Sequence, residues 1–176
     1  MRTSRACRSD LFSILLHLDD FFKYLNPSQE DKDWGLFLNC AGKTEIVPGV
    51  LYPPSAHPSG YHFTYEQGRI LNEYQINYIT SGEGVYESHS GKFKVKPGFL
   101  MITKPGRWHR YKPLKSTGWV ENYVGFSGHI AHQIFGRPWF TSKNAVVDVG
   151  HNEEIIDSYY KIFNYVKEEK PGHQQV

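Results

Sequence analysis

The 176-residue sequence has few cysteines, no long apolar run and almost no net charge. Its two cysteines, Cys7 and Cys40, are too few for a disulfide framework, so free thiols in a reducing compartment are expected. No stretch approaches the roughly 18 apolar residues that a membrane-spanning helix needs, and no membrane partner is expected. A formal net charge of +2 gives no overall attraction to nucleic acid or to a membrane surface.

The N-terminus has one feature that argues for secretion. Basic residues precede an apolar run from Leu11 to Leu18, as they do in a signal peptide. However, His17 interrupts the run, and Asp19 and Asp20 follow it in place of a small-residue cleavage site. A cytoplasmic protein is therefore the expectation, with secretion as the minor alternative.

Motifs of nucleophilic and phosphate-transfer enzymes are also missing. The sequence has no Gly-x-Ser-x-Gly elbow, no phosphate-binding loop and no Cys-x-x-Cys pair. Aromatic residues, by contrast, make up 15% of the chain, and many of them lie in strand-like segments, where they pack well on a pleated surface. This pattern favours a β-rich protein that binds a small molecule over an enzyme.

The most informative part of the chain is the stretch 74–126, where short alternating segments are separated by Gly and Pro at regular intervals. The predicted strands are Tyr74–Ser81, Val85–Ser88, Lys92–Val95, Phe99–Thr103, His109–Tyr111 and Trp119–Phe126. The Gly and Pro residues between them supply the fixed or positive φ of a tight reversal. Strands of this length and spacing predict a β-sandwich or jelly-roll barrel.

The N-terminal third is expected to be an arm and extension, residues 1–60, that lies over a barrel core of residues 61–127. Within the arm, the sequence predicts a short helix at Leu18–Leu25, a strand at Trp34–Leu38, and a turn at Ala41–Lys43 that leads to a second strand at Thr44–Val47. The prolines between residues 48 and 58 keep the next segment extended and outside the middle of a sheet.

A helical region, residues 128–176, is expected after the barrel. A short helix is predicted through Phe135 with Ser127 as its candidate N-cap, and a longer one from Glu153 to about Lys170 with Asn152 as its candidate N-cap. Four apolar residues of the longer helix lie on one face: Ile156, Tyr159, Phe163 and Val166. This stripe fits a homodimer interface or packing on the barrel, and the sequence leaves both open.

The chain resembles the N-terminal ligand-binding and dimerisation domain of AraC/XylS-type transcriptional regulators, a branch of the cupin superfamily. The motifs that carry the resemblance are Arg69 with Tyr74 and Tyr78 before Ser81-Gly82-Glu83-Gly84, Val95-Lys96-Pro97-Gly98, Lys104-Pro105-Gly106-Arg107-Trp108-His109-Arg110-Tyr111, and Trp119 through Phe126-Ser127-Gly128. The resemblance implies a mainly β fold with C-terminal helices, a cupin-like double-stranded β-helix (jelly-roll barrel) followed by a dimerisation helix.

The resemblance also implies partners. In this family the barrel binds a small-molecule effector, often a carbohydrate, the helices pair two subunits, and a separate C-terminal domain holds DNA. The present sequence ends near the start of what resembles a second dimerisation helix. A truncated sensor module is therefore expected, which would reach DNA only through a domain absent from this chain.

Metal-dependent cupins hold their ion with three histidines and a carboxylate. The matching strand here is Val85–Ser88 followed by His89, and it has no His-x-His pair, while Gly91 and Lys92 stand where the glutamate would fall. Only His109 remains of the set. No metal, no cofactor and no catalytic residue are therefore expected.

The ligand-binding residues are expected on the predicted strands His109–Tyr111 and Trp119–Phe126, and at Arg69, which precedes the strand Tyr74–Ser81. Period-two geometry puts Trp119, Glu121 and Tyr123 on one face of their strand, where rings can stack on a sugar and a carboxylate can accept from its hydroxyls. The resemblance adds Tyr111, and it makes His109 and Arg69 further candidates. Each also has a plainer explanation, as an ordinary core ring, a strand-end histidine or a surface charge.

These observations favour the effector-sensing and dimerisation domain of an AraC-type regulator, with a sugar or other small organic molecule in the barrel. A stand-alone small cupin enzyme, an isomerase or dioxygenase, is the alternative. A third possibility is a dimerisation module whose pocket is filled by its own aromatic side chains.

Overall fold

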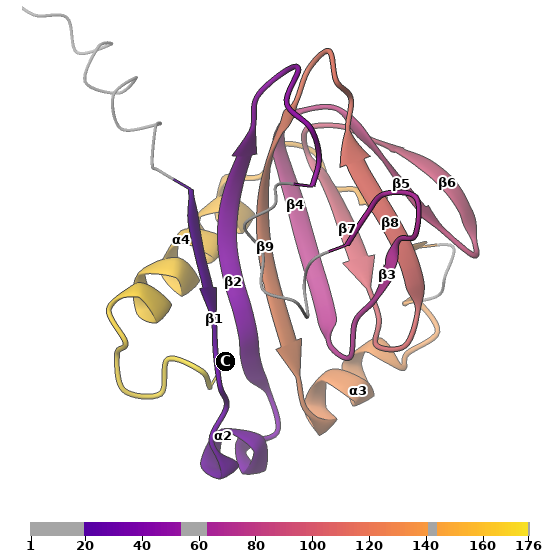
Figure 1. The fold of residues 1–176 in the computed structure, drawn as a ribbon. Coiled ribbons are helices and arrows are strands. Elements are labelled where there is room, and N and C mark those ends of the chain that lie inside the picture. The colour runs from indigo at the N-terminus through magenta and orange to yellow at the C-terminus, as the bar shows by residue number, and fades with distance from the viewer. Residues whose placement is uncertain (1–19, 54–62, 141–143, 176) are drawn as a thin grey trace, which may run out of the picture.

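The computed structural model describes residues 20–53, 63–140 and 144–175, which form two antiparallel β-sheets that face each other and helices at the outside (Figure 1). The six-stranded sheet has the order β1-β2-β9-β4-β7-β10 and the four-stranded sheet the order β3-β8-β5-β6. The strands are β1 (Phe21–Tyr24), β2 (Phe37–Ile46), β3 (Arg69–Ile70), β4 (Tyr74–Gly82), β5 (Gly84–Ser88), β6 (Gly91–Val95), β7 (Phe99–Thr103), β8 (Trp108–Pro113), β9 (Trp119–Ser127) and β10 (Val146–Asp148). The helices are α2 (Gln29–Trp34), α3 (His129–Phe135) and α4 (Glu153–Lys167).

This arrangement confirms the predicted fold class, a mainly β jelly roll with C-terminal helices. The strands predicted between residues 74 and 126 are found with ends that differ by at most a few residues. The side chains of the larger sheet alternate between two apolar clusters. One cluster lies between the two sheets, and the other lies between the larger sheet and α4.

Three predictions for the N-terminal third are wrong. In place of a helix, Phe21–Tyr24 is strand β1, paired with β2, while Leu18 lies outside the described residues. Its alternation sends Phe21 toward α4, where the Phe21 and Phe163 ring centroids are 5.6 Å apart. The larger sheet therefore contains β1 and β2 from the expected arm as well as strands from the expected barrel core, which begins at residue 61.

The segment expected to be a strand at Trp34–Leu38 begins as a helix. Ser28 caps α2, since its hydroxyl accepts from the Asp31 N–H at 3.1 Å while the Asp31 carboxylate accepts from the Ser28 N–H at 2.8 Å. The helix ends at Gly35, whose φ of 91° is the left-handed conformation that glycine adopts most readily.

The turn predicted at Ala41–Lys43 does not form, because β2 continues without a break through Gly42. Gly42 lies opposite Tyr123 of β9, and a Cβ atom added to it would be 2.5 Å from the Tyr123 hydroxyl oxygen. The glycine therefore makes space for a ring on the inner face of the sheet.

Helix α4 covers the outer face of the larger sheet (Figure 1). The N-cap predicted for α4 is confirmed, since the Asn152 side chain accepts from the Ile155 N–H at 3.1 Å. The N-cap predicted for α3 is wrong, because Gly128 and not Ser127 has the N-cap position there, and no side chain caps that helix. Tyr159, Phe163 and Val166 are buried in the cluster between helix and sheet, with the half-buried Ile156 packed beside them. The sequence left a homodimer interface and packing on the barrel open for this stripe. In the structure these side chains pack on their own sheet.

Replacing Phe163 with Ala tests this packing. The ring is 5% exposed, so its loss leaves a cavity and is expected to lower the free energy of unfolding by about 3 to 5 kcal/mol. The matched control is Tyr165→Ala on the same helix, where the ring is 51% exposed and the loss should stay below about 1 kcal/mol. Urea unfolding followed by circular dichroism measures both, and equal losses would contradict the packing.

Candidate functional site

The space between the two sheets is lined by polar side chains as well as rings. On β9 the predicted alternation is present, since Trp119, Glu121 and Tyr123 are all buried on one face. Strand β4 lies beside β9 and adds Gln75 and Asn77 to the same face, with Asn77 opposite Tyr123. The inner face of the larger sheet therefore has a polar centre.

Arg69 reaches this centre from the smaller sheet. The β3–β8 register puts Arg69 opposite His109, and its Nε donates to His109 Nε2 at 3.2 Å. Its Nη2 donates to the Tyr111 hydroxyl at 2.6 Å and to Gln75 Oε1 at 2.9 Å. The guanidinium carbon also lies 4.8 Å from the Phe63 ring centroid and 5.2 Å from that of Tyr111, within the range of cation–π contacts. One side chain thus joins the two sheets.

His109 is held as a neutral acceptor. Its Nδ1 lies 3.1 Å from the Arg107 carbonyl oxygen, which fits an N–H donated from that nitrogen and leaves Nε2 free to accept from Arg69. Burial, reinforced by the positive charge of Arg69, lowers the pKa of His109 to about 3.

Arg69, Gln75, Asn77, His109, Tyr111 and Glu121 together form a polar cluster between the sheets, called the Arg69 cluster below. Glu121 is its carboxyl group. Burial raises its pKa to about 7, although Arg69 and, more weakly, Asn77 act in the opposite direction. Burial also raises the pKa of Tyr111, and the nearby guanidinium of Arg69 partly offsets this effect. Near neutral pH the carboxyl group is therefore poised between accepting and donating a hydrogen bond.

Several buried polar atoms of this region have no hydrogen-bond partner in the described part of the chain. They include Nδ2 and Oδ1 of Asn77, Oε2 of Glu121 and Nε1 of Trp119. Asn77 is close enough to Glu121 and Tyr111 to lower the pKa of both, yet its amide does not have hydrogen-bond geometry with either. Each unmatched buried group costs about 1–3 kcal/mol, so these groups favour a polar guest.

A cavity of about 20 Å³ lies at this cluster. Residues that line it include Tyr52, Arg69, Gln75, Tyr111, Glu121 and Tyr123. This volume holds about one water molecule. The Tyr52 ring, from the segment that precedes residues 54–62, occupies much of the surrounding space, with its centroid 6.1 Å from those of Phe63, Tyr111 and Trp119.

The structure brings together all six ligand-binding candidates named from the sequence. Arg69, Tyr111, Glu121 and Tyr123 line the cavity, His109 binds Arg69, and Trp119 packs on Tyr111 with ring centroids 5.8 Å apart. Sequence reasoning missed Tyr52, Phe63, Gln75 and Asn77. For Gln75 and Asn77 a signal existed, because polar residues alternate with Tyr74, Ile76 and Tyr78 in a strand with a buried apolar face.

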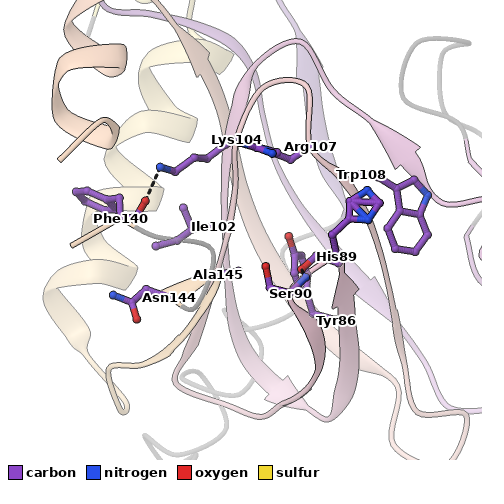
Figure 2. A pocket seen from close by; sticks show the side chains of 11 residues that line it. Tyr86, His89, Ser90, Ile102, Lys104, Arg107, Trp108, Phe140, Asn144 and Ala145 are labelled. Atoms are coloured by element: carbon purple, nitrogen blue, oxygen red, sulfur yellow. Dashed lines mark hydrogen bonds between the residues drawn. The ribbon is translucent and has the colours of Figure 1, made fainter. Parts of the chain in front are cut away.

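A second and larger cavity, of about 590 Å³, opens between the sheets at another place (Figure 2). Residues that line it include Tyr86, His89, Lys104, Arg107, Trp108 and Phe140. Tyr86 stacks on both His109 and Tyr111, with centroids 6.1 Å and 6.5 Å away, so aromatic rings connect this cavity with the Arg69 cluster.

Within the described ranges, no three His, Cys, Asp or Glu side chains are grouped so that they could hold a metal ion. The described helices include none with the length and apolar character required to cross a membrane.

The raised pKa of Glu121 predicts a pH-dependent effect of Glu121→Gln. Between its ordinary pKa of 4.5 and the folded value of about 7, the folded protein keeps a proton that the unfolded chain has released, so the contribution of Glu121 to stability falls as pH rises. Relative to wild type, the variant should therefore gain unfolding free energy across this window, by on the order of 3 kcal/mol at most.

His109→Gln provides the comparison of opposite sign. The pKa of His109 falls from 6.5 to about 3 on folding, so its contribution is lost as pH falls below 6.5, and the variant should gain relative stability toward acid. Urea unfolding at several pH values measures both series. Differences from wild type that stay constant with pH would contradict the assigned pKa shifts.

Comparison with known proteins gives one family. The model of the AraC-like ligand-binding domain matches residues 48–172. No curated protein matches the chain.

Among solved structures, the chain is similar to the protein YhaK from Escherichia coli, with 15% identity and a TM-score of 0.43, over 62% of this chain and 45% of YhaK. It is also similar to the cupin domain of Cnp3 from Schizosaccharomyces pombe, with 15% identity and a TM-score of 0.42, over 69% and 77% of the two chains. KdgF from a Halomonas species is 16% identical, with a TM-score of 0.35, over 60% and 77%. The chain thus spans less than half the length of YhaK.

The family match covers well over half of the chain, and it includes β3 to β10, α3 and α4 together with the residues of the Arg69 cluster. The jelly-roll topology agrees with it. The chain belongs to the AraC-like ligand-binding domain family.

Proposed function

We propose that this chain is the effector-sensing domain of an AraC-type transcriptional regulator of the cytoplasm, and that it binds a small hydroxylated molecule such as a sugar. The observation that carries the proposal is the set of unmatched buried polar atoms on Glu121, which lines the cavity with Arg69, and on Asn77, which lies close to Glu121. Contact with DNA would be made by a further domain outside these residues. In this role the domain binds its effector without catalysis.

The chemistry of the cluster suits a sugar. Hydroxyl groups both donate and accept, and the cluster offers the Asn77 amide and the Glu121 carboxyl group. The rings of Tyr111 and Tyr123, which line the cavity, provide surfaces for the apolar C–H faces of the same molecule. A guest of this kind meets the hydrogen-bonding capacity of groups that lack protein partners.

The volume of the cavity adds a mechanical consequence. About 20 Å³ is too small for a sugar, so a guest would have to displace the Tyr52 ring from its contacts with Tyr111 and Trp119. Tyr52 belongs to the proline-rich segment that was expected to lie over the barrel. Binding of the effector would then shift the position of this segment, which couples the pocket to the rest of a regulator.

A homodimer is part of the proposal. Because Tyr159, Phe163 and Val166 are buried against their own sheet, a second subunit would meet the opposite face of α4, where Tyr165 is 51% exposed. We therefore propose that α4 still forms the dimer contact, but through its exposed face and not through the apolar stripe.

Thermal-shift screening against a panel of monosaccharides, with Asn77→Leu as the test variant, examines the proposed site. At least one sugar should stabilise the wild-type protein, by about 2.7 kcal/mol at a hundredfold excess over its Kd. Asn77→Leu keeps the shape of the side chain and removes two polar atoms that have no described partner, so the variant should stay folded and lose at least tenfold in affinity.

The control is Asn164→Leu on the exposed side of α4, which should respond to the sugar as wild type does. No response to any sugar or polyol would instead favour a pocket filled by its own rings. Stoichiometric transition metal in the purified protein would favour an enzyme.

A further inference from the structure

The four-stranded sheet has an outer face that lies on the opposite side of the molecule from α4 (Figure 1). Tyr86, His109 and Tyr111 are buried on its inner face, so the residues that alternate with them along β5 and β8 point outward. The same alternation applies to β6, where Val95 is buried. The outward residues, called the outer basic face below, are Trp108, Arg110 and Lys112 on β8, Val85 and Glu87 on β5, and Lys92 and Lys94 on β6.

The three lysines of the outer basic face are held at fixed spacings by the sheet. Lys94 lies opposite Val85, and Val85 lies opposite Lys112, so the two lysines are two strands apart, about 10 Å along the sheet. Lys92 is two residues from Lys94 on β6, about 7 Å away. Lys92 and Lys94 are exposed and Lys112 is half-buried. Three ammonium groups therefore extend from one face of a rigid sheet.

The one carboxylate of the outer basic face is already matched. Both oxygens of Glu87 accept from Arg110, at 2.9 to 3.1 Å. A second acid, Glu66, is exposed next to Tyr65 at the border of this face. Among the described residues, however, no carboxylate lies within 4 Å of any of the three lysine ammonium groups. The positive charge of the lysines is therefore left for a partner, although the net charge of the whole chain is only +2.

Tyr65 orders the cations of β8 without neutralising them. Its ring centroid lies 3.8 Å from the Lys112 ammonium and 4.7 Å from the guanidinium carbon of Arg110, within the range of cation–π contacts. The Arg110 guanidinium carbon also lies 5.6 Å from the Trp108 ring, whose indole N–H donates to the Gln67 carbonyl oxygen at 2.8 Å. Lys112 is thus positioned by a ring and keeps its charge.

The composition of the outer basic face fits a nucleic acid better than a protein. Protein interfaces have aromatic or apolar anchors at their centre and few lysines. The nearest exposed large apolar residue in the sheet register is Ile70 of β3, at the other edge of the sheet from the lysines of β6. Surfaces that bind DNA are more polar and more positive, and their lysines contact phosphates whatever the base sequence.

We propose that the outer basic face binds the phosphate backbone of duplex DNA, with Lys92, Lys94 and Lys112 as the contacts. This binding is independent of base sequence, so the reading of a sequence still belongs to a further domain. It adds a DNA contact that was expected only from that domain. The sugar site of the Arg69 cluster lies on the inner face, and either proposal can fail without the other.

The experiment is a titration of a fluorescein-labelled DNA duplex with the full chain, followed by fluorescence anisotropy at several salt concentrations. Three lysine–phosphate contacts give a slope of log K against log salt of about −2.7, which is about a 40-fold loss of affinity between about 50 and 200 mM salt. Two duplexes of unrelated sequence should bind equally, because phosphates carry no sequence information.

Lys94→Gln removes one of the three contacts, so the slope should change to about −1.8. The variant should stay folded because Lys94 is exposed. The matched control is Lys161→Gln, which removes the same charge from an exposed position of α4 on the other side of the molecule. It should keep the slope of the wild-type protein.

Four outcomes would overturn the proposal. These are the absence of binding at low salt, an unchanged slope in Lys94→Gln, an equal change of slope in Lys161→Gln, and tighter binding of another polyanion than of the duplex at the same salt. Poly-glutamate as that polyanion would assign the face to an acidic protein, and phosphatidylserine vesicles would assign it to a membrane surface.

Discussion

Arg69 holds a permanently charged guanidinium between two β-sheets, and much of the interior is arranged around it. Removing such a group from water is costly unless its N–H groups are matched by acceptors. His109, Tyr111 and Gln75 provide those acceptors from β8 and β4, and Phe63 provides a ring face. Because these residues come from both sheets, the hydrogen bonds of one side chain determine how the sheets meet.

The larger sheet separates two kinds of packing. Its outer face carries apolar side chains that α4 covers, which supplies the hydrophobic stabilisation of the domain. Its inner face is free to be polar at its centre, where Gln75, Asn77 and Glu121 lie in adjacent strands. A jelly roll of this kind can therefore hold a polar site without losing its core, since the apolar contacts lie on the other side of the same strands.

The sequence predicts best what depends on local periodicity. Alternation alone places Trp119, Glu121 and Tyr123 on one inner face, and the Gly and Pro turns give the strand boundaries between residues 74 and 126. Local sequence wrongly predicts a turn at Gly42. The glycine is instead needed within β2, because a side chain there would collide with the Tyr123 ring of the neighbouring strand β9. Local sequence is also wrong for β1, whose apolar residues fit a helix face equally well until β2 is available as a partner.

Features that arise from distant segments leave no pattern in the sequence. Tyr52 lies near the Arg69 cluster through contacts with Tyr111 and Trp119, far along the chain. Lys104, which lines the larger cavity, donates to the carbonyl oxygens of Phe135 and Phe140, far along the chain. No motif encodes either arrangement, because each follows from how the two sheets and the segment before β10 are placed.

The most direct test of the Arg69 cluster as a binding site is a high-resolution crystal structure of the purified protein. A bound water or a hydroxylated guest is expected within hydrogen-bonding distance of both the Asn77 amide and Glu121 Oε2. Electron density in which Asn77 and Glu121 are bonded directly to each other, with no further molecule in the cavity, would contradict the account.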